Sequence, residues 1–246
     1  MEPVIVFKNV TKTYPYYGYI TAGFKTFLFN LPKALKYTRK RFTALEDISF
    51  EVYKGECFGV IGRNGAGKST LLGLIAGVLK PDRGKIEVKG RVSPLLELGA
   101  GFHPDLTGRE NIILNGILLG MTKKEVLNKM EEIIEFSELG EFIDQPLRTY
   151  SSGMMARLGF SVVAHLEPEI LLVDEVLAVG DINFQNKCIK KIESFREKGV
   201  TIVFVSHAIE QVEKMCDRVL WTDQHRIKAI GKAKEICKLY KKFMSD

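Results

Sequence analysis

Apolar and polar positions along the chain follow two periods, which separate predicted strands from predicted helices. Residues 4–10 alternate between apolar and polar side chains as a half-buried strand does, and residues 45–52 predict a second strand. The run from Cys57 to Gly62 is short and uniformly apolar, which is typical of a strand covered on both faces. Further apolar strands are expected at residues 170–173 and 200–205.

Helical spacing of apolar residues occurs between these strands and dominates the middle of the chain. Thr122 and Glu125 have the spacing of a capping box, which marks a helix start. Helices are expected over residues 68–79, 109–119 and 122–136, from about 152 to before Pro168, and over 231–246. Strands that alternate with helices in this way predict an α/β core.

The order of these elements suggests a division of the chain. An α/β core is expected over residues 1–100 and 168–230, with an antiparallel β region near its start. A helical subdomain, 101–167, is inserted into it, and a basic helix, 231–246, follows. Residues 15–42 are aromatic and basic and look like a second, smaller insert in the core.

Composition narrows the class of protein. A chain of 246 residues with 46% hydrophobic and 27% charged residues can bury a large core, which excludes disordered, collagen-like and coiled-coil proteins. No run approaches about 18 uncharged apolar residues, and the first ten residues lack the pattern of a signal peptide. We therefore expect a cytoplasmic protein. Its four cysteines are scattered singly and are expected to be reduced thiols in the core.

The net charge of +6 comes from the segment between Pro15 and Leu45, which has six cations and no acid. Aromatic side chains lie between these cations, a mixture that suits a membrane interface with anionic lipid. Docking on a transmembrane partner or on a lipid-linked glycan is an alternative, and an ordinary surface hairpin is a less favoured one. The cations are Lys25, Lys33, Lys36, Arg39, Lys40 and Arg41.

A glycine-rich segment after the buried strand fits the pattern G-x-x-x-x-G-K-[ST] in its required context, between a strand and a helix. Backbone N–H groups in such a loop close around a polyphosphate, and the helix N-terminus adds partial positive charge. Lys68 would reach the β- and γ-phosphates, and Ser69 would ligate Mg²⁺. The predicted nucleotide-binding residues here are Gly62, Asn64, Gly65, Ala66, Gly67, Lys68, Ser69 and Thr70.

Polar side chains follow two other predicted strands. Asp174 and Glu175 end the strand at 170–173, where buried carboxylates are costly unless a cation or substrate needs them. Asp174 would hold Mg²⁺ through water, and Glu175 would polarise the attacking water as general base. His207 follows the strand at 200–205 and could reach the γ-phosphate from the same sheet edge.

The string YSSGM at residues 150–154, together with the phosphate loop, Asp174, Glu175 and His207, resembles the nucleotide-binding subunit of ATP-binding cassette transporters over nearly the whole chain. The usual signature of that family is LSGGQ, and this sequence departs from it at the first, third and fifth positions. The resemblance implies a P-loop NTPase with a RecA-like core. It also implies that Ser151, Ser152 and Gly153 bind the γ-phosphate of ATP held by a second subunit.

Three further residues can be assigned from the resemblance. Tyr14 occupies the position of an aromatic residue that stacks on adenine, and Asp181 matches the acidic residue of a loop that communicates across the dimer. The family has a glutamine between the core and the helical part. Here Glu97 or its neighbour Leu98 falls at that place, and Glu97 is the candidate metal-facing acceptor.

The strings LLELGAGFHPDLTGRENI and LLVDEVLAVGD look like the branch that exports bacterial cell-surface polysaccharide, such as O-antigen, teichoic acid or capsule. This resemblance implies a homodimer that hydrolyses ATP with Mg²⁺ and drives two integral membrane permease subunits. It would lie peripherally on the cytoplasmic face of the inner membrane and export a lipid-linked polysaccharide. No nucleic-acid partner is expected.

Other functions remain as alternatives. The chain could serve an exporter of lipid or drug, or, as a cassette ATPase without a permease, act on nucleic acid or ribosomes. The latter proteins usually have coiled-coil inserts or two cassettes, which this sequence lacks. A small-molecule kinase would not need the YSSGM string, and a GTPase would need N-K-x-D, which is absent.

Overall fold

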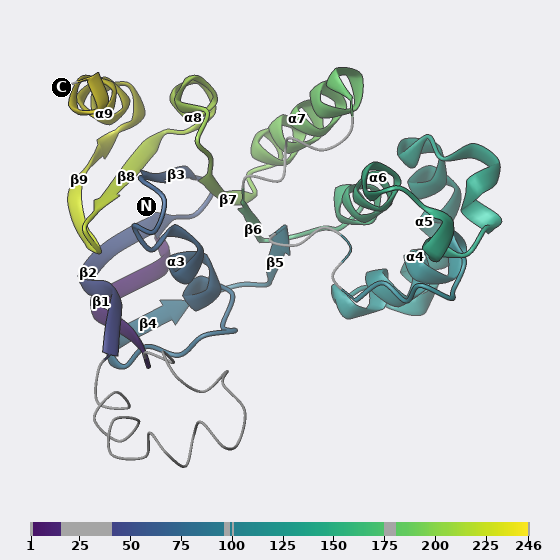
Figure 1. The fold of residues 1–246 in the computed structure, drawn as a ribbon, viewed down its shortest axis with the longest axis horizontal. Coiled ribbons are helices and arrows are strands. Elements are labelled where there is room, and N and C mark those ends of the chain that lie inside the picture. Colours follow the sequence, from purple (N-terminus) through teal and green to yellow (C-terminus); the bar gives the residue numbers. More distant parts are fainter. Residues whose placement is uncertain (1, 16–40, 96–98, 100, 175–180, 246) are drawn as a thin grey trace, which may run out of the picture.

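A computed structural model describes residues 2–15, 41–95, 99, 101–174 and 181–245 (Figure 1). Two β-sheets form its body. The smaller is antiparallel, in the order β2-β1-β4, with bounds β1 Pro3–Pro15, β2 Arg41–Tyr53 and β4 Arg83–Val88. The larger has the order β5-β6-β7-β3-β8-β9, with bounds β3 Cys57–Gly62, β5 Val92–Leu95, β6 Ile170–Val173, β7 Thr201–Val205, β8 Arg218–Asp223 and β9 Arg226–Lys232.

The larger sheet is covered on both faces, which explains its uniformly apolar strands. Strands β5, β6, β7, β3 and β8 are parallel, and β9 pairs antiparallel with β8. Helices α7 (Ile182–Glu197), α8 (Ile209–Met215) and α9 (Ala233–Ser245) lie over one face, while α3 (Lys68–Ile75) and the small sheet lie over the other (Figure 1). In β3, Ile61 packs into the first layer and Phe58 into the second, both fully buried.

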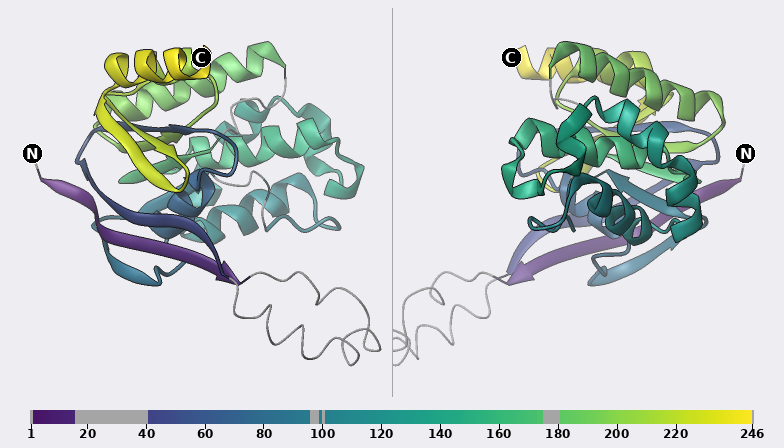
Figure 2. Two further views of the ribbon diagram at one scale, coloured as in Figure 1. Left: turned by 60° about the vertical axis from the view of Figure 1, so that its left-hand side comes forward. Right: turned by 90° about the vertical axis from the view of Figure 1, so that its right-hand side faces the viewer.

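Three further helices lie beyond β5, away from the small sheet (Figures 1 and 2). They are α4 (Gly108–Leu118), α5 (Lys123–Ser137) and α6 (Ser152–Ala164), with two short 3-10 turns, η1 (Gly140–Asp144) and η2 (Leu147–Thr149), between α5 and α6. The predicted capping box is present: the Glu125 N–H donates to Thr122 Oγ1 at 3.2 Å, and the Thr122 N–H donates to Glu125 Oε2 at 2.6 Å. The bond from the Thr122 N–H, and then that from the Thr122 hydroxyl, lowers the pKa of Glu125.

The α/β fold with an antiparallel β region and helical segments is confirmed, but several predicted boundaries are wrong. The strand expected over 4–10 continues to Pro15, and the strand expected over 45–52 begins at Arg41. The helix expected over 68–79 ends at Ile75, because Gly77 adopts a left-handed φ of +73° and the N–H of Leu79 returns to the carbonyl of Gly73. The C-terminal helix begins at Ala233 rather than 231, because residues 231 and 232 belong to β9. The division into domains remains a prediction.

The basic insert predicted over 15–42 falls almost wholly on residues 16–40, which lie outside the described part of the chain. The strands that lead to and from it are described, and Asp82 ties them together. Asp82 Oδ2 accepts from the Thr13 N–H at 2.6 Å, and Arg41 Nη2 lies 3.2 Å from Asp82 Oδ1. The Thr13 N–H bond is the main cause that lowers the pKa of Asp82.

All four cysteines are buried free thiols, as predicted. Burial raises the pKa of Cys188 to about 12 and that of Cys237 to about 11. Among the residues that the structure describes, no helix combines the length and hydrophobicity needed to cross a bilayer.

Candidate functional site

The predicted catalytic residues follow three neighbouring parallel strands. The phosphate loop leaves β3 at Gly62, Asp174 follows β6 directly, and His207 lies just beyond the end of β7. Because β6 pairs with β7 and β7 with β3, all three positions share the carboxyl edge of one sheet, where open α/β sheets bind ligands. Asp174 is half-buried and His207 is exposed. Glu175 and Glu97 lie outside the described residues, so their roles remain predictions.

The phosphate loop ends where α3 begins, and its last glycine is required by the local packing. Gly67 is the N-cap of α3 with φ +96°. A Cβ at this position would lie 2.5 Å from the carbonyl oxygen of Ala44 and 2.5 Å from the Leu45 side chain. Any other residue would therefore push the loop away from β2, and the N-terminus of α3 would lose its place.

The ammonium of Lys68 is buried at the first position of α3. The residue is 7% exposed, and Nζ donates to the carbonyls of Gly62 at 3.0 Å and Arg63 at 3.2 Å. A buried cation is costly unless it is hydrogen-bonded, and these loop carbonyls satisfy it. Its charge adds to the positive end of the helix dipole, so this turn of the chain favours an anion.

A pocket of about 380 Å³ opens beside this loop. Its lining residues come from the ends of β1 and β2, from the phosphate loop and from the start of α3. They are Tyr14, Phe42, Ala44, Asn64, Gly65, Gly67, Lys68, Ser69 and Thr70. The structure thus brings together seven of the residues predicted to bind nucleotide, while Gly62 and Ala66 do not line the pocket.

Two aromatic side chains border the pocket, of which the sequence analysis assigned only one to the site. The Tyr14 hydroxyl lies 3.5 Å from Thr70 Oγ1, which places its ring close to the first turn of α3. Phe42 was placed in the basic insert. It is the cross-strand partner of Tyr14 in the small sheet, and its ring packs edge-on against His225. Such pairing was not visible in the sequence because residues 16–40 separate the two strands.

The signature residues lie at the start of α6 and not in this pocket. Ser151 is the N-cap, and its Oγ accepts from the Met154 N–H at 3.2 Å. Ser151 and Ser152 are exposed and Gly153 is half-buried. Figure 1 shows α6 on the far side of β5 and β6 from α3. Within one chain, therefore, the signature does not line the phosphate-loop pocket.

Tyr150, which stands where the family usually has leucine, is buried. Its hydroxyl donates to the Phe142 carbonyl at 2.5 Å, and burial raises its pKa to about 12. A Cβ on Gly108 would lie 2.5 Å from that hydroxyl, so Gly108 provides the room for the larger side chain. The departure from the usual signature is thus accommodated by the helical packing.

Asp181 lies at the N-cap of α7, where Oδ1 accepts from the N–H groups of Asn183 at 2.9 Å and Phe184 at 3.0 Å. Its carboxylate also pairs with Arg157 on α6, which in turn pairs with Glu138 at the end of α5. Asp181 therefore links the helical part to α7 within one chain. Its predicted role across a dimer remains a prediction.

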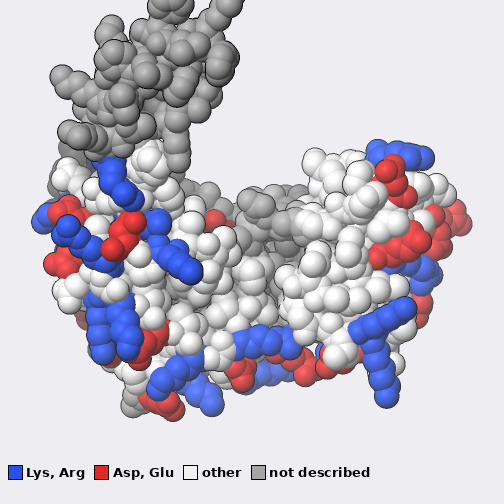
Figure 3. Space-filling view, turned by 90° about the horizontal axis from the view of Figure 1, so that it is seen from below, with Lys and Arg blue, Asp and Glu red and all other residues white. Residues whose placement is uncertain are grey.

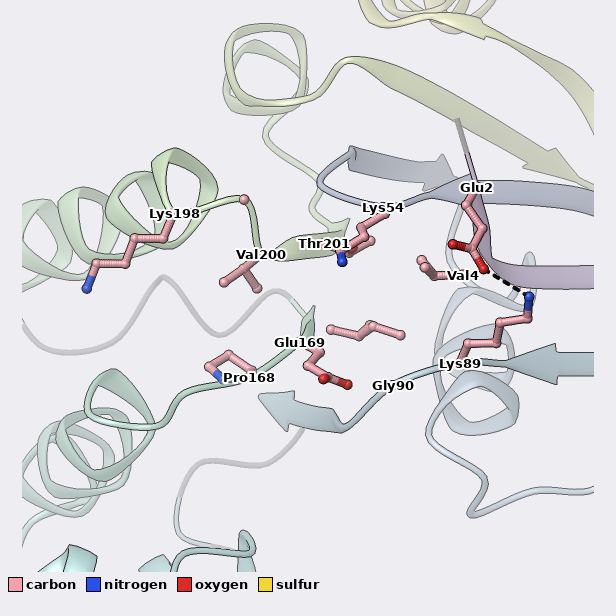
Figure 4. A pocket seen from close by; sticks show the side chains of 12 residues that line it. Glu2, Val4, Lys54, Lys89, Gly90, Pro168, Glu169, Lys198, Val200 and Thr201 are labelled. Atoms are coloured by element: carbon pink, nitrogen blue, oxygen red, sulfur yellow. Dashed lines mark hydrogen bonds and ion pairs between the residues drawn. The ribbon is translucent and has the colours of Figure 1, made fainter.

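A second cavity, of about 390 Å³, lies at the opposite edge of the sheet (Figure 4). Its border is formed by the amino end of β6, next to Glu169, by the amino end of β7, at Thr201, and by the segment before β5. Glu169 is engaged there, because its Oε2 accepts from the Arg91 N–H at 2.6 Å. None of the predicted site residues lines this cavity, and the strands point away from it.

A phosphate loop between a buried parallel strand and a helix, with an acid and a histidine at the same sheet edge, defines a P-loop nucleotide-binding protein. Residues 45–178 match the family described as ABC transporter. The chain belongs to this family, and it is an ATPase that binds ATP.

Relatives agree with this assignment, and a solved structure shares the fold. The chain is 60% identical, over all of both chains, to an O-antigen export system ATP-binding protein from Klebsiella pneumoniae. It is 51% identical to a teichoic acids export ATP-binding protein from Enterococcus faecalis, over 82% of this chain and 45% of that protein. A dimeric ATP-binding cassette bound to ADP and phosphate shares the fold at 22% identity, with a TM-score of 0.72 over 93% of this chain and 98% of that one.

The buried hydroxyl of Tyr150 gives a stability prediction. Tyr150→Phe removes the hydroxyl's hydrogen bond to the Phe142 carbonyl, which keeps the Gln145 N–H as its other donor, and this loss costs about 1 kcal/mol in the free energy of unfolding. ATP affinity should not change, because Tyr150 lies outside the phosphate-loop pocket. Urea unfolding and equilibrium ATP binding would measure both quantities. Tyr53→Phe, whose hydroxyl donates to the side chain of Glu51, is the control and should lose less. An equal loss in the two variants would contradict the assignment.

Asp181 gives a prediction about pH. Its pKa is lowered, chiefly by the Phe184 N–H and also by Arg157, so its ionised form stabilises the fold. That stabilisation is fully present above the unfolded-state pKa of about 3.9 and is lost as the pH falls through the lower folded-state pKa. Asp181→Asn keeps a side chain that can cap α7 but removes the negative charge. The variant should therefore be less stable than the natural protein at pH 7, and the difference in stability should shrink as the pH falls toward 3. Urea unfolding over that range would test this, and a difference independent of pH would contradict it.

Proposed function

We propose that this chain is the ATP-hydrolysing subunit of a transporter that exports a lipid-linked cell-surface polysaccharide through a separate permease. The observation that carries the proposal is the 60% identity, from end to end of both chains, to a protein named for O-antigen export. Similarity to teichoic acid export proteins supports the same class of cargo. The pocket at the phosphate loop supplies the ATP site that such a subunit needs.

In this proposal each residue at the carboxyl edge of the sheet has a separate role in binding or hydrolysing ATP. The Lys68 ammonium binds the β- and γ-phosphates, and Tyr14 and Phe42 bracket the adenine end of the pocket. Ser69 and Asp174 would hold Mg²⁺, since hydroxyl and carboxylate oxygens are ligands it prefers, and the ion neutralises phosphate charge when bound. Glu175 accepts a proton from the attacking water, and His207 contacts the γ-phosphate.

We further propose that the working unit is a homodimer. Ser151, Ser152 and Gly153 are accessible but do not line their own chain's pocket, so a second copy is required to bring them to the γ-phosphate. Asp181, at the start of α7, would lie near the boundary between the copies. The dimeric arrangement of a solved cassette with this fold supports the proposal.

We further propose that the permease docks on the face shown in Figure 3 and that the dimer lies on the cytoplasmic side of the inner membrane. That face is hollowed between the α/β part and the helices, and its visible surface in the hollow has few charged side chains. Charged residues gather on the outer rims instead. Such a surface suits burial against another protein, because few charges would have to be desolvated.

Replacement of Lys68 tests the proposed function. In cells whose sole copy is Lys68→Ala, one class of surface polysaccharide should be lost and its lipid-linked form should accumulate inside, because the triphosphate loses its main cation. A surface-glycan profile measures this, and Lys54→Ala, an exposed lysine at the opposite edge of the sheet, is the matched control. If the profile is unchanged while purified Lys68→Ala protein has lost ATP binding, polysaccharide export is wrong, and lipid and drug export should be examined.

Replacement of Glu175 tests the dimer. Glu175→Gln should slow hydrolysis and leave the protein as an ATP-bound dimer, because water activation is lost while phosphate binding is kept. Analytical sedimentation with ATP and Mg²⁺ measures the association. Glu131→Gln, a substitution of the same kind on the exposed side of α5, should behave like the natural protein. A Glu175→Gln protein that stays monomeric at saturating ATP would contradict the sandwich of two subunits.

A further inference from the structure

An aromatic and cationic cluster joins the C-terminal helix α9 to the phosphate loop. Phe243 and Tyr240 come from α9, Trp221 from β8 and Lys228 from β9, while Arg63 is the second residue of the phosphate loop. We call these five residues the α9 cluster. Four of them lie outside the recognised nucleotide-binding pattern, Arg63 occupies one of its variable positions, and no role is predicted from the sequence for any of the five.

Phe243 lies at the centre of the α9 cluster and contacts two cations. The Arg63 guanidinium carbon lies 5.1 Å from the centroid of its ring, and Lys228 Nζ lies 3.3 Å from the same centroid. Trp221 packs against Phe243 at 5.1 Å and edge-on against Tyr240 at 5.3 Å. Both cations therefore lie within the range of a cation–π interaction with one half-buried ring.

Arg63 is consequently held by two different interactions, one through its side chain and one through its main-chain carbonyl. Its side chain lies against Phe243, and its main-chain carbonyl accepts from Lys68 Nζ at 3.2 Å. The residue that contacts α9 is thus also the residue whose carbonyl orients the phosphate-binding ammonium. A change in the position of Arg63 would change the position of that carbonyl.

A second connection runs through the sheet beneath the loop. In the parallel pair β3–β8, Ile61 is the partner of Trp221 and Gly62 the partner of Thr222. The Thr222 hydroxyl donates to the Ile61 carbonyl at 3.3 Å, and a Cβ on Gly62 would lie 2.4 Å from the Thr222 carbonyl. This close approach fixes the point where the loop leaves β3 relative to Trp221.

Helix α9 is itself firmly placed, so it can act as a support. Ile236, Cys237 and Tyr240 are buried against the sheet. On its other side Lys241 pairs with Glu210 at 3.2 Å and Glu213 at 3.1 Å on α8. These contacts hold α9 against α8, β8 and β9, so the position of Phe243 beside the loop is fixed.

We propose that Phe243 is a positioning residue for ATP binding: it holds Arg63 so that the phosphate loop keeps the conformation that binds phosphate. Nucleotide binding at the loop in turn changes the surroundings of Trp221. The inference rests on the nucleotide site proposed above. It makes the C-terminal helix part of the ATP site, although α9 contributes no residue to the pocket itself.

The chain contains one tryptophan, Trp221, so its fluorescence reports on the α9 cluster alone. Addition of ATP with Mg²⁺ to the full chain should change this emission. Phe243→Leu keeps an apolar side chain but removes the ring face, so it should weaken ATP binding about two- to fivefold and abolish the change in Trp221 emission. Phe243→Tyr keeps a ring and should restore both properties.

Leu239→Ala, an exposed position on the same helix, is the matched control and should leave affinity and emission response unchanged. Arg63→Met with α9 intact should also abolish the emission response, which keeps the test valid should Phe243→Leu disturb the helix. In a double-mutant cycle on ATP affinity, adding Phe243→Leu to Arg63→Met should have little further effect.

The outcomes separate this inference from the proposed function. If the natural protein fails to bind ATP, the nucleotide site is wrong and this inference is wrong with it. If the natural protein binds ATP but Phe243→Leu and Arg63→Met keep the Trp221 response, or their effects on affinity are additive, the nucleotide site stands and the positioning role of Phe243 is overturned.

Discussion

The burial of one ammonium group, that of Lys68, is the constraint on which the rest of this site depends. A buried cation needs oxygen partners, and here the carbonyls of Gly62 and Arg63 supply them. Those carbonyls can turn toward the ammonium only because β3 is fixed between two apolar layers and Gly67 allows α3 to start against β2. The sheet, the loop and the helix together therefore place positive charge at the start of α3.

The residues proposed to act on one phosphate are distributed over two parts of the chain. Lys68 begins α3 and Asp174 directly follows β6, while Ser151 caps α6, which lies on the far side of β5 and β6 from α3 (Figure 1). Arg157 links these parts, because it pairs with Asp181 on α7 and with Glu138 on α5. In a dimer that opens and closes on ATP, this bridge would transmit the position of the signature helix to the core of the same subunit.

Local signals in the sequence were enough to predict the centre of the site but not its borders. The strand Cys57–Gly62, the glycine loop and the capping box at Thr122 are each encoded within a few residues. The β8–β9 hairpin was missed because its turn uses Gln224 and His225, both with positive φ, in place of the usual Asn-Gly. Phe42 and Arg157 were missed because their roles depend on contacts between segments far apart in the chain.

Tyr14 and Phe42 are cross-strand partners at the open end of β1 and β2, and both line the pocket at the phosphate loop. The next pair along this ladder, Pro15 and Arg41, is the last one before residues 16–40. The basic insert is thus mounted on the two strands that form the aromatic wall of the pocket. A partner that displaces residues 16–40 would therefore act on the rings of Tyr14 and Phe42, which lie within two residues of that segment on each strand, before it acts on the rest of the core.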